Sequence, residues 1–236
     1  MSDVRTRVIE LLDRAHADLQ AFIATLPEAD RSAVGTREKW AIKDALSHVA
    51  MWQRQTITRV AVLLRDEEPS NTDDYLAVND AHFEAYRDRS WADTIAEADG
   101  AYRALVALTQ SLSEEELTDP QRFARANGRA LVRSIIGNGF VHTETHLAQL
   151  YVERGALDYA VQLQEEVTAR LEDIPEERRV ARYNLACFYA LAGQKARALT
   201  ELTTALKLNP DLAEWSKQDS DLDSLRDDPA YQALYQ

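Results

Sequence analysis

The chain has 236 residues, and its 27 Lys and Arg against 40 Asp and Glu give a formal net charge of −13 at pH 7. A chain this acidic repels phosphate backbones and anionic lipid, and no basic patch stands out, so we expect neither nucleic-acid nor membrane binding. Hydrophobic residues make up 45% of the sequence, which is typical of a globular protein. Because Cys187 is the only cysteine, an intrachain disulfide is excluded and a reducing, cytoplasmic compartment is favoured.

Hydrophobic residues with helical spacing predict long helices over the first two thirds of the chain. The predicted helical segments are 4–26, 40–64, 73–112 with a bend at Ser90, a short helix after Ser113, and 129–153. Seven Gly and six Pro are few for this length, which agrees with long elements and few turns. No segment alternates with period two, so the sequence predicts an all-α protein without strands.

An internal repeat spans the end of the last long helix and the chain beyond it. The first copy recurs 38 positions later, with Leu147, Ala148, Tyr151, Gly155 and Ala160 matched by Leu185, Ala186, Tyr189, Gly193 and Ala198. This pattern resembles the tetratricopeptide (TPR) arrangement of two antiparallel helices, although two generic helical hairpins would share it. We therefore expect one domain over 1–158 and a TPR-like helical tail over 159–236.

The tail holds one complete repeat, over 180–210, and a partial copy. Such repeats need about three units to bury a continuous core. We therefore expect its apolar faces to be covered by the N-terminal domain, by a second copy in a homodimer, or by a protein partner.

Histidines are the residues of this sequence most suited to bind a metal. His142 and His146 are four residues apart, which places both imidazoles on one helix face, but two histidines at that spacing also arise by chance. Glu144 lies two residues after His142, so the segment does not fit the HExxH pattern of zinc proteases, and we expect a solvated surface charge. His48 lies in an apolar helical stripe, where an imidazole needs a partner: it is a hydrogen-bonded core residue or a third ligand.

The segment 40–49, WAIKDALSHV, resembles the second-helix signature of the DinB-like four-helix-bundle superfamily, with its Trp, acidic residue and His in matching places. In that superfamily the His joins a His-x-x-x-His pair on the last bundle helix, here His142 and His146. Ala41 departs from the signature, in which a Ser or Thr caps the helix. Segments 74–79 and 84–91 resemble the third-helix region of the ClbS/DfsB branch. The resemblance covers about residues 4–155.

The resemblance implies a DinB-like four-helix bundle with one divalent ion, zinc or nickel, bound by His48, His142 and His146. Members of the superfamily include metal-dependent thiol transferases, a maleylpyruvate isomerase and a colibactin-protecting hydrolase. It therefore implies hydrolysis or thiol transfer on a small reactive molecule, with a low-molecular-weight thiol in the second case. The alternative is a non-catalytic bundle with a TPR-like interaction or assembly module. No sequence feature identifies a catalytic group, and the sequence leaves open whether the protein is an enzyme.

Several further polar residues belong near this site. Asp44 and Gln149 could orient the ligand rings, although surface pairing fits either one equally well. We expect Asn79 to line the pocket, His82 to lie at the surface and His16 to form a hydrogen bond in the core.

Two glycines interrupt the last long helix just before its histidine pair. Gly137 and Gly139 each cost about 1 kcal/mol relative to Ala in a helix interior. Close helix packing or room for a ligand would explain that cost.

Overall fold

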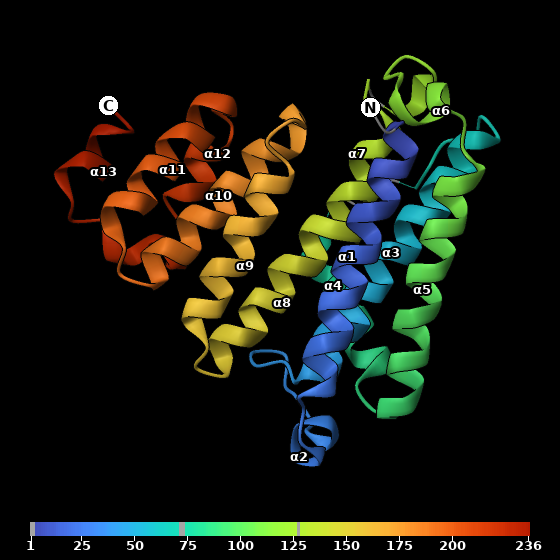
Figure 1. The fold of residues 1–236 in the computed structure, drawn as a ribbon, viewed down its shortest axis with the longest axis horizontal. Helices are drawn as coiled ribbons and strands as arrows, with labels where there is room; N and C mark the ends of the chain where they lie inside the picture. The colour runs from blue at the N-terminus through green and yellow to red at the C-terminus, as the bar shows by residue number, and fades with distance from the viewer. Residues whose placement is uncertain (1–2, 71–73, 127) are drawn as a thin grey trace. The chain divides into compact units, whose positions relative to one another are not determined.

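The computed structural model describes residues 3–70, 74–126 and 128–236, and Figure 1 shows its helices. These ranges contain helices and turns and no strand, which confirms the all-α prediction. Contacts divide the chain into two compact units, 1–143 and 144–236. The domain boundary expected at 158/159 stays a prediction. Within the described ranges, no helix has both the length and the apolar character needed to span a membrane.

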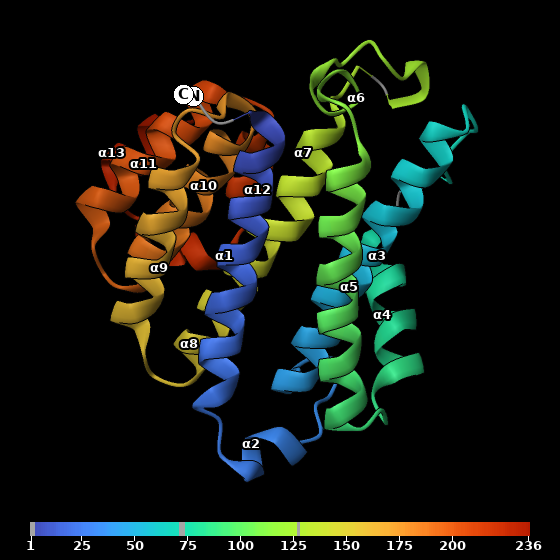
Figure 2. The ribbon, with the colours of Figure 1, turned by 45° about the vertical axis from the view of Figure 1, so that its right-hand side comes forward.

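Long helices that pack side by side build the first unit (Figures 1 and 2). They are α1 (Val4–Ala24), α3 (Ile42–Leu64), α5 (Trp91–Ser111) and the continuous run of α7 (Leu131–Ile136), η2 (Gly137–Val141) and α8 (His142–Glu153). Shorter elements are α2 (Glu28–Ser32), α4 (Tyr75–Tyr86), α6 (Glu114–Thr118) and the 3-10 turn η1 (Ala124–Ala126). Helix α1 packs against α5, α7 and η2, and α3 packs against α4, α5 and η2.

Local capping explains where several of these helices begin. Ser90 accepts the Asp93 N–H, so the expected bend divides the third helical region into α4 and α5. Asp74 accepts the Ala77 N–H at 2.9 Å and caps α4. The expected start of that region at Asp73 lies outside the described residues.

The core of this unit is close-packed around Gly139. A Cβ atom at this position would lie 2.3 Å from Leu12 Cδ2 and 2.7 Å from Leu105 Cδ2. Both leucines are almost fully buried, and burying such a side chain contributes about 1.5–3 kcal/mol. Close helix packing therefore explains this glycine.

The second unit contains the rest of α8 and a series of shorter antiparallel helices. These are α9 (Leu157–Arg170), α10 (Pro175–Leu191), α11 (Lys195–Leu208), α12 (Leu212–Ser216), the 3-10 helix η3 (Ser220–Leu225) and α13 (Pro229–Ala233). Helix α10 packs against α9, α11 and η3.

The sequence repeat has a counterpart in the backbone of this unit. Gly155 and Gly193 end α8 and α10 with φ angles of +75° and +69°, a left-handed conformation that favours glycine. The residue after each glycine bonds back to the matching tyrosine, Ala156 N–H to Tyr151 O at 2.9 Å and Gln194 N–H to Tyr189 O at 2.8 Å. The same helix-ending turn thus recurs at an offset of 38 residues.

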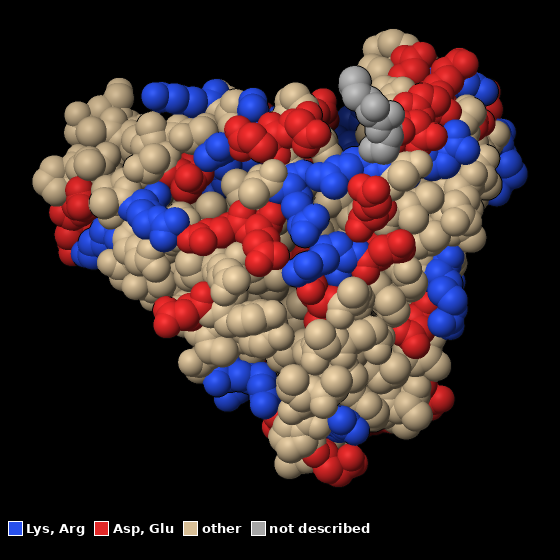
Figure 3. All heavy atoms as spheres, viewed as in Figure 1, with Lys and Arg blue, Asp and Glu red and all other residues tan. Residues whose placement is uncertain are grey.

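Charged side chains of both signs are interspersed on the face shown in Figure 3. In the second unit, Arg182 pairs with Glu172 at 2.7 Å and with Glu201 at 2.6 Å. The Arg182–Glu201 pair is partly buried, whereas Glu172 is exposed; exposed ion pairs contribute little to stability. Because acidic and basic side chains alternate, the described part of the face shown in Figure 3 has no extended basic surface.

Candidate metal centre

Three histidines from two helices come together in the structure. His48, on α3, is 4% exposed, and its Nε2 lies 3.1 Å from Nε2 of His142, the first residue of α8. One turn later on the same helix is His146, and one ring nitrogen from each of the three residues lies within 4.8 Å of the others. His142 and His146 both lie on α8, and this continuous helix fixes the spacing of the pair.

The donor set fits a divalent ion. Imidazole nitrogens bind zinc at about 2.0–2.1 Å, and two such ligands of one tetrahedral or octahedral ion lie about 3.0–3.4 Å apart. The 3.1 Å separation of the two Nε2 atoms falls in this range. Three neutral imidazoles suit zinc or nickel and leave coordination positions open for water or substrate.

The protonation state of His146 favours metal binding. Burial lowers its pKa to about 4, and a hydrogen bond with Gln149 acts in the opposite direction. The ring is therefore neutral at pH 7, and only a neutral imidazole binds a metal. A hydrogen bond with Gln149 would orient the His146 ring. The orienting role of Gln149 stays a prediction.

A π-helical turn precedes the histidine pair. In η2 the His142 N–H donates to Gly137 O, five residues earlier, whereas an α-helix uses the carbonyl four residues earlier. Single turns of this kind are frequent at functional sites. In this chain the turn sets the direction in which α8 presents His142.

Aromatic rings surround the two facing imidazoles. The Trp52 ring centroid lies 6.3 Å from that of His48 and 6.5 Å from that of His142, edge-on to both. The Trp40 ring lies 4.8 Å from that of His48. Trp52 Nε1–H donates to Asn79 Oδ1 at 3.2 Å. Two tryptophan rings thus lie next to His48, and one of them also lies next to His142.

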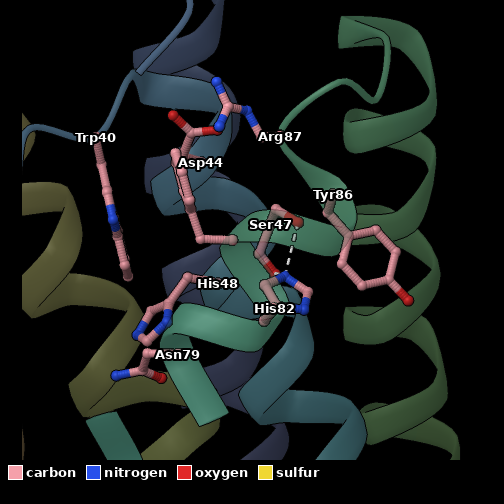
Figure 4. Close-up of a pocket in the computed structure, with 9 residues that line it drawn as sticks. Trp40, Asp44, Ser47, His48, Asn79, His82, Tyr86 and Arg87 are labelled. Carbon is pink, nitrogen blue, oxygen red and sulfur yellow. Dashed lines mark hydrogen bonds between the residues drawn. The ribbon is translucent and has the colours of Figure 1, made fainter. Parts of the chain in front are cut away.

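A hollow of about 220 Å³ opens beside His48, between α3 and α4 (Figure 4). Its lining residues are Trp40, Asp44, Ser47, His48, Asn79, His82, Phe83, Tyr86 and Arg87. Asn79 lies in this lining, where the resemblance to the DinB-like superfamily placed it. Trp40, Phe83 and Tyr86 form the aromatic part of the hollow. The polar groups lie at two places: Asn79 is near His48, and the Asp44 carboxylate is beside Arg87 at the other end (Figure 4).

Asp44 lines the hollow, and its carboxylate forms a hydrogen bond with the backbone. Its carboxylate accepts the Ala41 N–H at 2.8 Å, which caps α3 at the position where Ala41 has no side-chain acceptor. Burial raises the pKa of Asp44, and backbone hydrogen bonds from Ala41 and Gly35 oppose that shift. An orienting role toward the ligand rings stays a prediction.

Two sequence predictions of surface exposure are wrong. His82 is half-buried in the hollow, and its Nε2 lies 2.9 Å from Ser47 Oγ and 3.1 Å from Ser47 O. Burial lowers the pKa of His82, against the raising effect of the backbone hydrogen bond with Ser47. Glu144 is 1% exposed, because α9 covers this side of α8 and Gln164 donates to the Glu144 carbonyl at 3.1 Å. Ser47 was not identified from the sequence as a residue of this site. The only sequence feature that could have indicated it is its position next to His48.

His16 lies apart from the three-histidine group. Its ring stacks on Tyr102 at 3.9 Å with planes 2° apart, and its Nε2 lies 3.7 Å from Asp99 Oδ1. Both rings line a second hollow, of about 290 Å³, that also contains Leu12 and Gly139. Burial lowers the pKa of His16, against the raising effect of Asp99.

The fold and the site together define a helical-bundle protein with a group of three histidines that could hold a metal ion. The chain matches the DinB superfamily over residues 8–150, more than half of its length, and belongs to that superfamily of metal-binding proteins. Comparison with curated proteins gave no match, and neither did comparison with solved structures.

Proposed function

We propose that this protein is a divalent-metal-dependent enzyme that acts on a small reactive molecule by hydrolysis or thiol transfer. The observation that carries the proposal is the 3.1 Å approach of the His48 and His142 Nε2 atoms, with His146 in the same group. The neighbouring hollow beside His48 is the place where a small substrate would approach the site. Membership of the DinB superfamily supports the same reading, and the proposal includes the ClbS/DfsB branch and a cytoplasmic location.

The metal, zinc or nickel, would be held by His48, His142 and His146. Once bound, such an ion polarises a substrate oxygen, and it lowers the pKa of a water or thiol toward about 7. The chain itself supplies the walls: Trp40 and Tyr86 exclude water and pack against apolar parts of the substrate. Asn79 has its carbonyl oxygen engaged by Trp52, so its amide hydrogens are the groups that could hold a substrate oxygen.

A second candidate function rests on the repeated turn in the second unit. We propose that residues 159–236 form a TPR-like module that binds a protein partner or a second copy of the chain. The matching left-handed glycines, Gly155 and Gly193, support this reading. In that case the bundle would act as a scaffold, with or without catalysis of its own.

Turnover assays distinguish the two functions. Metal-loaded protein is incubated with a panel of electrophiles, alone and with glutathione, bacillithiol or mycothiol, and His142→Ala serves as the matched control. The enzyme proposal predicts turnover that His142→Ala loses. Absence of turnover and of ligand binding across the panel would favour the interaction module, which light scattering and partner capture then test.

A further inference from the structure

Three buried polar side chains, those of Gln53, Thr56 and Thr143, and the partly buried Asn138 tie the π-helical turn η2 to α3. We propose that Gln53, Thr56, Asn138 and Thr143 form a clamp that holds η2 in its π-helical form, so that α8 presents His142 to His48. These four are positioning residues for the metal centre, and the inference rests on the metal site of the proposed function.

The geometry of the turn explains why it needs holding. An α-helix advances about 100° per residue. In the structure the His142 N–H bonds to Gly137 O, five residues earlier. If it bonded to Asn138 O, four residues earlier, this turn of helix would contain one residue fewer. Everything after it would rotate by about that angle, which would carry His142 and His146 away from His48. The direction in which His142 and His146 point around the axis of α8 therefore depends on the π turn.

The first contact of the clamp joins the turn to α3 through Thr56. Asn138 Nδ2 donates to Thr56 Oγ1 at 2.8 Å, and Thr56 Oγ1 in turn donates to Trp52 O at 3.1 Å. Thr56 is 3% exposed. The Thr56 hydroxyl thus accepts from Asn138 on η2 and donates to the Trp52 carbonyl on α3. Removing this hydroxyl leaves the part-buried Asn138 amide without its acceptor, at a typical cost of about 1–3 kcal/mol.

The second contact acts at the first turn of α8. Gln53 Nε2 donates to Thr143 Oγ1 at 3.3 Å, and Thr143 Oγ1 donates to Gly139 O, within the π turn, at 3.1 Å. Gln53 and Thr143 are 6% and 3% exposed. Because Thr143 directly follows His142, this contact fixes the ligand's own turn of helix against α3.

The bundle also contains a matched control. Thr109, on α5, is fully buried and donates to Leu105 O at 2.8 Å, which is the same bond to the carbonyl four residues earlier that Thr143 makes. Among the residues that the structure describes, its hydroxyl bonds to no other helix. Thr109→Val thus reproduces the loss of a buried hydroxyl without touching the clamp.

The test uses the full chain and Co²⁺ as the probe, with two readouts: the Co²⁺ dissociation constant from competition with a chelator and the visible d–d spectrum of the bound ion. The variants are Thr56→Val, Thr56→Ser, Thr143→Val and Thr109→Val, each checked for folding by circular dichroism. We expect Thr56→Val and Thr143→Val to weaken Co²⁺ binding by about 10–100-fold and to alter the spectrum. Thr56→Ser and Thr109→Val should keep the wild-type affinity and spectrum.

Folded Thr56→Val and Thr143→Val proteins with wild-type affinity and spectrum would overturn the clamp while leaving the metal site in place. An equal loss in Thr109→Val would overturn it too, since the effect would then be general destabilisation. If the wild-type chain bound no Co²⁺, the metal site itself would be refuted, and the clamp with it.

Discussion

Replacing Gly139 with Ala should destabilise the bundle, although alanine is the better helix former. The new Cβ would lie 2.3 Å from Leu12 Cδ2 and 2.7 Å from Leu105 Cδ2, far inside van der Waals contact. Both leucines are buried, with exposed fractions of 2% and 0%, so neither can turn into solvent. Relieving the clash requires a shift of α1 or α5 or a change of side-chain rotamer, and either one disturbs the packing of the core.

The magnitude follows from two opposing terms. Overpacking a core of this kind costs about 1–3 kcal/mol, and the gain in helix propensity from Gly to Ala returns about 1 kcal/mol. We expect a net loss of up to about 2 kcal/mol. At about 2–4 °C per kcal/mol for a chain of this size, the melting temperature should fall by up to about 8 °C.

Gly100→Ala is the matched control. This glycine also lies within a long helix, α5, but a Cβ there would meet only Arg54 Nη2, at 3.0 Å, the end of a flexible side chain. We therefore expect Gly100→Ala to raise the melting temperature by a few degrees, through propensity of about 1 kcal/mol. Thermal melts of the two variants should move in opposite directions. Stabilisation by Gly139→Ala as large as that by Gly100→Ala would refute the packing argument.

Three further outcomes follow from the contacts of individual side chains and turns. Because burial lowers the pKa of His82 in the folded state, the unfolded chain binds its proton more readily. Stability should therefore fall as the pH drops below about 6.5, and His82→Gln should show a flatter dependence in urea titrations; equal slopes would contradict this. Burial, reinforced by Asp219, raises the pKa of the Cys187 thiol, so Ellman's reagent should not label the folded protein at pH 8 but should label it in guanidinium. Gly155→Ala and Gly193→Ala should each cost about 1–2 kcal/mol, because both positions have left-handed backbones, and a neutral result at either would break the structural equivalence of the two turns.

The helical stripes explain most of what the sequence could predict. Val8, Leu11, Leu19 and Phe22 follow the helical period, and all are buried in α1. The same reasoning placed His48 on a buried stripe, because a helix face is a local property that the spacing of side chains determines.

Local periodicity could not predict the π turn or the environment of the residues around it. In a π turn the hydrogen bond goes to the carbonyl five residues earlier, whereas in an α-helix it goes to the carbonyl four residues earlier. This difference shifts the spacing of apolar residues by only one position, and the apolar residues of 129–153 do not reveal it. Glu144 was expected at the surface because it lies off the helix face of the histidine pair, and no sequence feature placed His82 in the interior. Their burial comes from α9 and from the packing of α4 on α3, which are contacts between segments distant in the chain.

Metal stoichiometry tests the central claim most directly. Purified protein, loaded with Zn²⁺ or Ni²⁺ and desalted, is analysed by inductively coupled plasma mass spectrometry beside His48→Ala, His142→Ala and His146→Ala, with His16→Ala as the control outside the group. The three-histidine centre predicts about one ion per wild-type and His16→Ala chain, and loss of that ion in each of the other three variants. Full occupancy in His48→Ala and His142→Ala would show that the ion is bound elsewhere and would contradict the account.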